Sequence, residues 1–182
     1  AGRAPHSIER DFAPITMGAD VPLMLLANPA VPARDLRGFV EHAKGRADLF
    51  YGSTGPGSTM NLVGEILKRD AGIRMEHVPF RGAAPLVQDM LAGRVHFGGD
   101  QLPSSIGHIR NGALRPLATI AAKRAGLLPE VPTAREQGFP NIELLGWNGF
   151  FAPAGTPAPV LERLHREIAA AARHPEVARR IT

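Results

Sequence analysis

Residues 50–70, FYGSTGPGSTMNLVGEILKRD, combine a strand, a glycine-rich loop and a helix in direct succession. The apolar run Leu49–Tyr51 predicts a short buried strand, and after Ser58 the apolar residues recur at helical spacing. Three glycines let the backbone between them turn sharply and approach a bound molecule closely: Gly52, Gly55 and Gly57. A strand that leads through a loop into a helix is the repeating unit of an α/β fold.

The loop at residues 52–59 has the properties of an anion-binding site. The first amides of a helix have no acceptor within the helix and lie at the positive end of its dipole, so they suit a negatively charged group. Four hydroxyl side chains add further polar groups: Ser53, Thr54, Ser58 and Thr59. The alternative is an ordinary glycine-rich turn in which Ser58 caps the helix. The loop by itself leaves both interpretations open.

Two catalytic signatures resemble this loop, and both are incomplete. The glycine spacing is that of a phosphate-binding P-loop, but Ser58 stands where that motif has its lysine. Tyr51 stands at the first glycine position of the nucleophile elbow that would surround Ser53. We therefore expect no nucleotide hydrolysis. A serine hydrolase that pairs Ser53 with His77 or His96 stays as an alternative.

Composition favours a protein that binds small anions. The 182 residues carry a net charge of +4 and include no cysteine, which excludes disulfides and thiolate metal sites. The basic residues are scattered, and the sequence contains one Trp and one Tyr, so recognition of nucleic acid is disfavoured. His77 and His96 have no second ligand at metal spacing. We expect neither a cofactor nor a bound metal.

The remaining sequence repeats the alternation of strands and helices. Gly18-Ala19-Asp20 is expected to separate the first two of these strands: 12–17, 21–27, 49–51, 75–80, 94–98 and 114–121. Helices are expected after most of them, and a last one from Pro175 toward Ile181. This order predicts a mainly parallel sheet flanked by helices, in which ligands bind beyond the carboxyl ends of the strands. Three loops would meet there: 52–59, 81–84 and 99–104.

Seven segments follow one another in a recognisable order: DFAPIT, LLANPAVPARDL, YGSTGPGST, HVPFRGAAPLVQDMLAGRVHF, DQLPSSIGHIRNGALRPLA, PEVPTAREQGFP and WNGFFAPAGTPAPVLERLHREI. The series spans nearly the whole chain and resembles the Bug-type, or TctC-like, solute receptors of tripartite tricarboxylate transporters. The resemblance implies a periplasmic-binding-protein type II-like fold. It also implies a periplasmic receptor without catalytic activity, which clamps a small carboxylate or amino-acid-like solute and delivers it to membrane permease subunits.

The resemblance implies that the chain lacks the leading part of the family's first domain, and with it any signal peptide. Residues 24–145 would form one complete ligand-binding domain, domain two. Residues 1–23 and 146–182 would be remnants of an incomplete domain one, joined to it by a hinge around 21–26 and 145–150. We expect such a chain to bind its solute weakly, and the exposed remnants to favour a homodimer. The effector-binding domain of a transcription regulator is an alternative with a similar architecture.

The resemblance also implies solute contacts in all three loops and the hinge, and Thr54 joins them through its hydroxyl: Ser53, Thr54, Gly55, Gly57, Ser58, Thr59, Arg81, Gly82, Ala83, Asp100 and Trp147. The second loop would contribute mainly backbone amides. Asp100 would lie at the floor of the site and Trp147 would wall it. The simpler alternatives are a turn or helix cap for Asp100, a solvated Arg81 and a buried aromatic for Trp147.

Overall fold

The computed structural model of the chain describes residues 6–144 and 146–177. These residues form two compact units. The larger unit takes the described residues of Pro22–Leu145, and the smaller one takes those of Ala1–Val21 and Gly146–Thr182. The chain therefore begins in the smaller unit, forms the larger one and then returns. The helix expected from Pro175 toward Ile181 lies in part outside the described residues.

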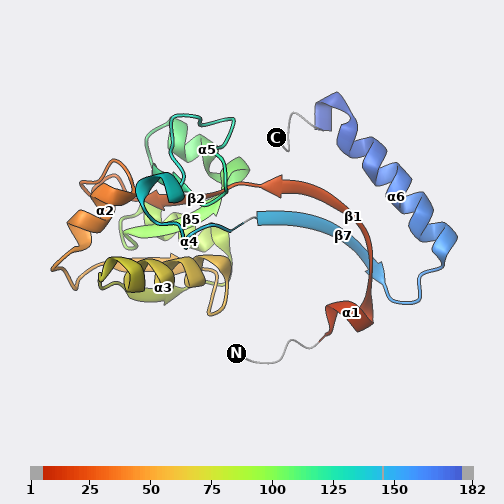
Figure 1. Ribbon diagram of the computed structural model, residues 1–182, viewed down its shortest axis with the longest axis horizontal. Helices are drawn as coiled ribbons and strands as arrows, with labels where there is room; N and C mark the ends of the chain where they lie inside the picture. The colour runs from red at the N-terminus through yellow and green to blue at the C-terminus, as the bar shows by residue number, and fades with distance from the viewer. Residues whose placement is uncertain (1–5, 145, 178–182) are drawn as a thin grey trace. The chain divides into compact units, whose positions relative to one another are not determined.

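The larger unit is built on a five-stranded sheet with the order β4-β3-β5-β2-β6. β2 and β5 lie side by side in this sheet (Figure 1). Its strands are β2 (Leu23–Ala27), β3 (Phe50–Ser53), β4 (Glu76–Pro79), β5 (Phe97–Gln101) and β6 (Arg115–Thr119). β3 pairs in parallel with β4 and β5, whereas β2 pairs antiparallel with β5 and β6. Four strands thus run in one direction, as a mainly parallel sheet requires, but the inverted β2 makes the sheet mixed.

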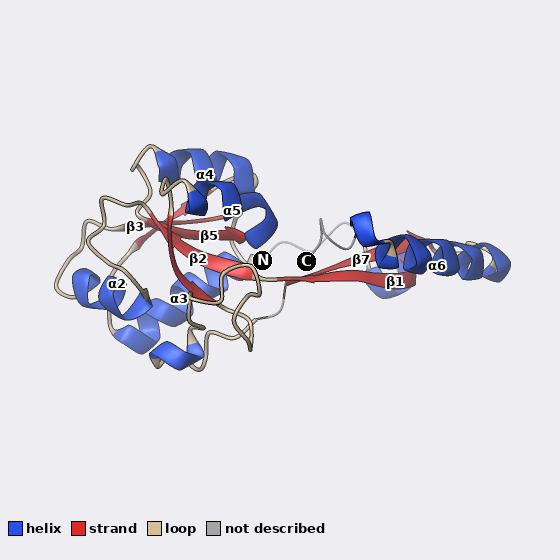
Figure 2. Cartoon of the chain, turned by 90° about the horizontal axis from the view of Figure 1, so that it is seen from above, coloured by secondary structure: helices blue, strands red, loops and turns tan. Residues whose placement is uncertain are grey.

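Helices cover both faces of this sheet, as expected (Figure 2). α2 (Leu36–Ala43) and α3 (Thr59–Ala71) pack on one face, and α4 (Ala83–Leu91) and α5 (Leu102–Arg110) pack on the other. Successive side chains of a strand point to opposite faces, so Leu25 joins the first core while Met24 and Leu26 join the second. The sheet is therefore buried between two apolar cores.

Gln137, in the short 3₁₀ helix Arg135–Gln137, ties the start of α2 to β6. Its buried side chain accepts from the Leu36 amide at 2.7 Å and donates to the Leu117 carbonyl at 2.9 Å. It also accepts from the Arg37 amide at 3.3 Å. One side chain therefore satisfies two amides of the helix N-terminus that have no acceptor within the helix.

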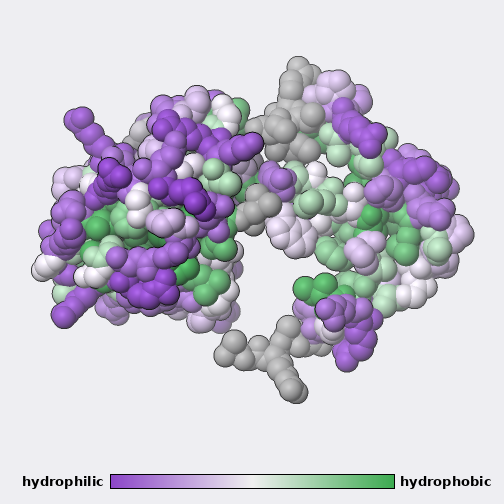
Figure 3. Space-filling view, viewed as in Figure 1, coloured by the Kyte–Doolittle hydropathy of each residue, from purple (hydrophilic) through white to green (hydrophobic). Residues whose placement is uncertain are grey.

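The smaller unit consists of α1 (Ile8–Asp11), an antiparallel pair of strands, β1 (Phe12–Val21) and β7 (Gly146–Pro153), and α6 (Ala158–Arg173). The expected break at Gly18-Ala19-Asp20 is wrong, because β1 continues through these residues to Val21 with only a register shift between Met17 and Ala19. A Cβ at Gly18 would lie 2.9 Å from the Phe150 ring, so this glycine serves close cross-strand packing. Several large apolar side chains lie at the surface of this unit (Figure 3).

Of the helices that the structure describes, none combines the length and the apolar character of a membrane span.

Candidate functional site

Three strands of the larger unit end at the same edge of the sheet. Parallel pairing sets Ser53 beside Pro79 and Tyr51 beside Phe97, so the carboxyl ends of β3, β4 and β5 are adjacent. The Phe80 amide donates to the Ser53 carbonyl at 2.8 Å, which holds the starts of the first two loops together. α3 and α4 both begin just beyond this edge, after those loops.

The third expected loop is absent as a loop. β5 extends to Gln101 and α5 begins at Leu102, so residues 99–104 belong to a strand and a helix. The strand is prolonged because β2 pairs Leu23 with Gln101, and the Leu102 amide donates to the Pro22 carbonyl at 2.9 Å. The glycines before Asp100 therefore serve packing: a Cβ at Gly99 would lie 2.8 Å from the Met24 carbonyl oxygen.

The glycines of the first loop have two different roles. Gly55 and Gly57 have φ angles of +118° and +80°, which favour glycine, and a Cβ at either would meet no atom within 4 Å. Gly52 instead lies at the end of β3, where a Cβ would be 2.1 Å from Leu86 Cδ1. Only Gly55 and Gly57 thus serve the sharp turn, and Gly52 serves the packing of α4 on the sheet.

The protein itself engages three amides of the first loop. Gly55 N–H donates to Ser53 Oγ at 3.1 Å, and Gly57 N–H donates to Asn61 Oδ1 at 2.9 Å. Ser58 N–H donates to the Gly55 carbonyl at 3.2 Å. Among the described residues, the amides of Thr54 and Thr59 have no hydrogen-bond acceptor, and both residues are exposed. The first loop therefore offers a solute fewer amides than its sequence suggests.

Ser53 and Ser58 use their hydroxyls inside the protein. Ser58 is the N-cap of α3, and its Oγ accepts from the Asn61 amide at 3.4 Å. Ser53 is fully buried, and its Oγ lies 2.7 Å from His77 Nε2 and 3.1 Å from both the amide and the carbonyl of Gly55. Ser53 therefore shapes the turn, and the capping interpretation holds for Ser58.

The contact between Ser53 and His77 is also the one that the hydrolase alternative requires. However, the Ser53 side chain has no exposed surface for a substrate. Within the described residues, no carboxylate hydrogen-bonds the second ring nitrogen of His77, which a triad would use for orientation. His96 contacts a different group: its Nδ1 accepts from the Phe50 amide at 3.0 Å. The arrangement is that of a structural pair beneath the loop.

The second loop leaves its amides and its cation available. Gly82 is the N-cap of α4 with a φ of +141°, and it has no side chain that caps the helix. Ala83, the first residue of α4, follows directly. Arg81 is exposed, and in the part of the chain that the structure describes its guanidinium has no hydrogen bond or ion pair. An uncapped helix start next to an unpaired arginine favours an anion.

Asp100 and Trp147 have different surroundings. Asp100 on β5 is 7% exposed, and its Oδ2 accepts from Ser104 Oγ in the first turn of α5 at 2.7 Å. The helix-cap alternative for Asp100 is wrong, because Gln101 is the N-cap of α5 and no side-chain hydrogen bond caps that helix. Trp147 lies on β7 of the smaller unit and is 54% exposed, with its ring centroid 6.5 Å from that of Phe151. The alternative of a buried aromatic is wrong, because the two-stranded sheet leaves this face uncovered.

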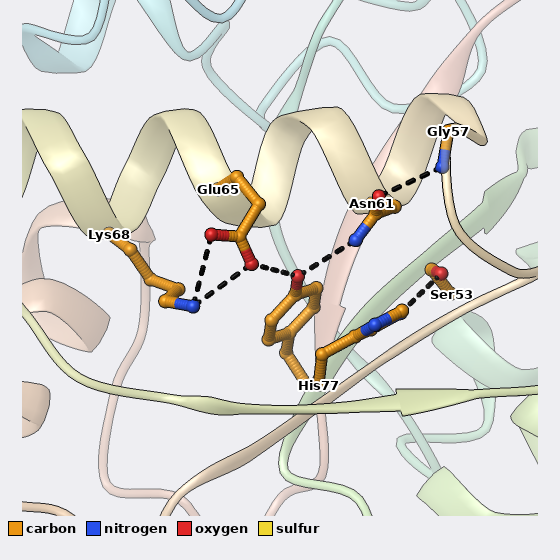
Figure 4. Close-up of polar contacts among 7 residues, drawn as sticks. Ser53, Gly57, Asn61, Glu65, Lys68 and His77 are labelled. Atoms are coloured by element: carbon orange, nitrogen blue, oxygen red, sulfur yellow. Dashed lines mark hydrogen bonds and ion pairs between the residues drawn. The ribbon is translucent and has the colours of Figure 1, made fainter. Parts of the chain in front are cut away.

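A polar network under the first loop escaped the sequence analysis (Figure 4). The Tyr51 hydroxyl donates to Glu65 Oε1 at 2.5 Å and accepts from Asn61 Nδ2 at 3.1 Å, and Lys68 Nζ lies 2.9 Å from Glu65 Oε1. Burial, followed by the Glu65 carboxylate, raises the pKa of Tyr51. The hydrogen bond from Tyr51, followed by that from Lys68, lowers the pKa of Glu65. The sequence signal that could have revealed this network is the spacing of Asn61, Glu65 and Lys68, which places the three side chains on one face of a helix.

The sequence of the chain matches a known receptor family over nearly its whole length. The family model described as the tripartite tricarboxylate transporter family receptor matches residues 3–182. A protein from Pseudomonas sp. strain P51, described as a UPF0065 protein in the tcbD-tcbE intergenic region, is 37% identical over 177 residues. That alignment covers 96% of this chain and 53% of the relative. The chain thus spans about half the length of this curated relative.

Two solved structures share the fold of the chain. One, described as the structure of a periplasmic transporter, has 35% identity and a TM-score of 0.91, and the match covers 98% of this chain and 60% of that protein. The other, R. palustris Rpa4515 with adipate, has 34% identity and a TM-score of 0.89, and the match covers 94% of this chain and 58% of that protein. The expected periplasmic-binding-protein fold is confirmed.

Proposed function

The chain belongs to the receptor family of tripartite tricarboxylate transporters, and from this premise we propose that it binds a small carboxylate solute in the periplasm for delivery to membrane permease subunits. The observation that carries the proposal is the second loop, where the uncapped start of α4 lies next to the unpaired guanidinium of Arg81. Adipate, the dicarboxylate described with the R. palustris relative, is a suitable probe.

The proposed binding surface uses the groups that the protein leaves free. The amides and hydroxyls of Thr54 and Thr59 would donate from the first loop, and the amides of Gly82 and Ala83 would donate from the second, with Arg81 as the cation. A hydrogen bond to a charged group contributes about 1.5–3 kcal/mol, and a helix N-terminus adds about 0.3–1 kcal/mol. Three such contacts, less the cost of ordering, suffice for roughly micromolar affinity in a closed site.

The other predicted site residues have indirect or untested roles in this proposal. Ser53, Gly55, Gly57 and Ser58 would hold the first loop in shape, because their polar groups or φ angles are already committed to the turn. Asp100 as the floor of the site and Trp147 as its wall stay predictions. The larger unit would be the complete ligand-binding domain, and the smaller unit would be the incomplete one.

We also propose that the chain has no catalytic activity. The fully buried Ser53 favours a binding protein over the hydrolase alternative. An ester-hydrolysis assay that compares the parent with Ser53→Ala tests this point, and turnover that depends on Ser53 would contradict it. The regulator alternative is tested by the coding sequence upstream of the chain: a receptor predicts a signal peptide and the rest of domain one, and a regulator predicts a DNA-binding module.

The proposal also includes a homodimer formed through the smaller unit. Eight large apolar side chains of that unit are at least 37% exposed: Ile8, Met17, Trp147, Phe150, Phe151, Val160, Leu164 and Val177. Apolar surface of this kind favours association with another chain. Light scattering of the 182-residue chain is expected to give twice the monomer mass, and a clean monomer at high concentration would contradict the dimer.

The test of solute binding is an NMR titration of the ¹⁵N-labelled 182-residue chain with adipate. We expect saturable shifts of the amides of Thr54, Thr59, Gly82 and Ala83, at weak affinity. Adipamide, which has the same carbon skeleton without charge, is the control and should leave these amides unchanged. Equal shifts with both compounds, or no shift with adipate, would overturn the proposal.

A further inference from the structure

The network beneath the first loop has a fixed direction (Figure 4). Glu65 is ionised and can only accept, so the single proton of the Tyr51 hydroxyl is donated to it. That hydroxyl then offers only lone pairs to Asn61, which must turn its Nδ2 toward Tyr51. The opposite end of the same amide, Oδ1, therefore faces the Gly57 N–H at 2.9 Å. The carboxylate of Glu65 thus determines which end of Asn61 meets the loop.

Packing holds the Tyr51 ring in place, so its hydroxyl can fix the orientation of the Asn61 side-chain amide. Its side chain is fully buried, and its ring stacks on His77 with centroids 4.9 Å apart. On its other side the ring lies against α3 at Gly64, where a Cβ would be 2.2 Å from Tyr51 Cε2. Because neither the ring nor the helix can shift far, the hydroxyl stays between Glu65 and Asn61.

We propose that Asn61 is a positioning residue, which holds the Gly57 amide and so sets the conformation of the first loop, and that Tyr51 and Glu65 fix its orientation. This inference rests on the proposed function, because the loop would present the free amides of Thr54 and Thr59 to the solute. Gly57 has a φ of +80°, and a Cβ there would meet no atom within 4 Å, so the hydrogen bond that its N–H donates to Asn61 Oδ1 restrains it. None of the three positioning side chains needs to touch the solute.

A second Glu–Lys ion pair with the same spacing as Glu65 and Lys68 provides a control. Glu41 on α2 and Lys44, the C-cap of that helix, are also three residues apart and form an ion pair of 2.7 Å, but among the described residues Glu41 accepts from no tyrosine. Glu41→Gln is therefore the matched control for Glu65→Gln. Both variants remove one charge from an exposed ion pair, and only Glu65→Gln removes the charge that orients Tyr51 and Asn61.

The experiment uses the 182-residue chain and five variants: Asn61→Leu, Tyr51→Phe, the double variant of these two, Glu65→Gln and Glu41→Gln. The first readout is the Gly57 amide proton in the NMR spectrum, which should move to lower frequency in the first four variants and stay in place in Glu41→Gln. The second readout is the affinity for adipate, which should fall about tenfold in Asn61→Leu and a few-fold in Tyr51→Phe. Tyr51→Phe should add nothing in an Asn61→Leu background, because both changes act through one contact.

Two results would overturn the inference. One is an unchanged Gly57 resonance in Asn61→Leu, and the other is an equal response to Glu65→Gln and Glu41→Gln. Failure of the proposed function is a separate outcome. If adipate shifts no amide of the parent chain, that function fails, whereas movement of the Gly57 resonance in Tyr51→Phe still supports the positioning network. Thermal unfolding of each variant excludes global loss of structure as the cause.

Discussion

The Ser53 hydroxyl lies 2.7 Å from Nε2 of His77, and the same oxygen lies 3.1 Å from both the amide and the carbonyl of Gly55. A hydroxyl has one proton to donate and two lone pairs, so three partners occupy it completely. The pair that resembles the start of a catalytic triad is thus the support of a turn. This difference between a nucleophile and a structural serine leads to the first prediction.

Ser53→Ala should lower the free energy of unfolding of the chain, and it should leave the rate of ester hydrolysis unchanged. Loss of the hydroxyl leaves the Gly55 amide and His77 without their partner, so the free energy of unfolding should fall by about 1–3 kcal/mol in a urea titration. Ser105→Ala is the matched control, because Ser105 is equally buried but bonds only to carbonyls near the start of its own helix. A smaller effect at Ser53 than at Ser105 would contradict this prediction.

Gly57→Ala and Gly107→Ala should have opposite effects on stability. Both sites have room for a methyl group, but Gly57 has a φ of +80° and Gly107 is inside α5. Alanine at residue 57 should therefore lower the free energy of unfolding by about 1–2 kcal/mol through backbone strain alone. Alanine at residue 107 should raise it by about 0.5–1 kcal/mol, because glycine is a poor helix former. Chemical denaturation of both variants measures the difference, and the same sign for both would refute it.

Gln137→Leu should be among the most damaging single changes in the larger unit. The substitution leaves the Leu36 amide and the Leu117 carbonyl without their buried partner. An unsatisfied buried group costs about 1–3 kcal/mol, so the expected loss of unfolding free energy is about 2–4 kcal/mol. Gln88→Leu on the exposed side of α4 is the control and should change stability by about 0.5 kcal/mol or less. Equal melting temperatures for the two variants would show that Gln137 is dispensable.

Acidification should destabilise the chain in part through His96. Burial lowers the pKa of His96; Asp48 opposes this effect, whereas Arg46 and His42 add to it. The Nδ1 atom of His96 must stay unprotonated to accept from the Phe50 amide. The neutral form is therefore favoured in the folded state. The contribution of His96 is fully present above the unfolded pKa of about 6.5 and is lost as the pH falls through the lower folded pKa.

The measurement for His96 is the free energy of unfolding from pH 7.5 to pH 4.5, in the parent and in His96→Asn. Asparagine keeps an acceptor oxygen near the position of Nδ1 and does not titrate. The difference in stability between the two proteins should therefore change with pH only below about pH 6.5. Parallel curves across the whole range would contradict the assignment.

The candidate site was predictable where local sequence was sufficient. The loop after Tyr51, the helix start near Ser58 and the turn before Ala83 follow from glycine spacing and apolar periodicity, which act over a few residues. The number of amides left for a solute was not predictable. The side chains of Asn61 and Ser53 accept hydrogen bonds from two of these amides. The same side chains could instead bond to water, so the sequence does not show whether they reach the amides.

Patterns that repeat along the chain were enough to predict the α/β class, the helices on both faces of the sheet and the family to which the chain belongs. Three features could be recognised only in the folded chain: β2 runs against its neighbours, β1 continues past Gly18, and Ser53 turns inward to His77. These features depend on contacts between residues far apart in the sequence. Such contacts are selected by the packing of the whole unit, and the pattern of any one segment does not specify them.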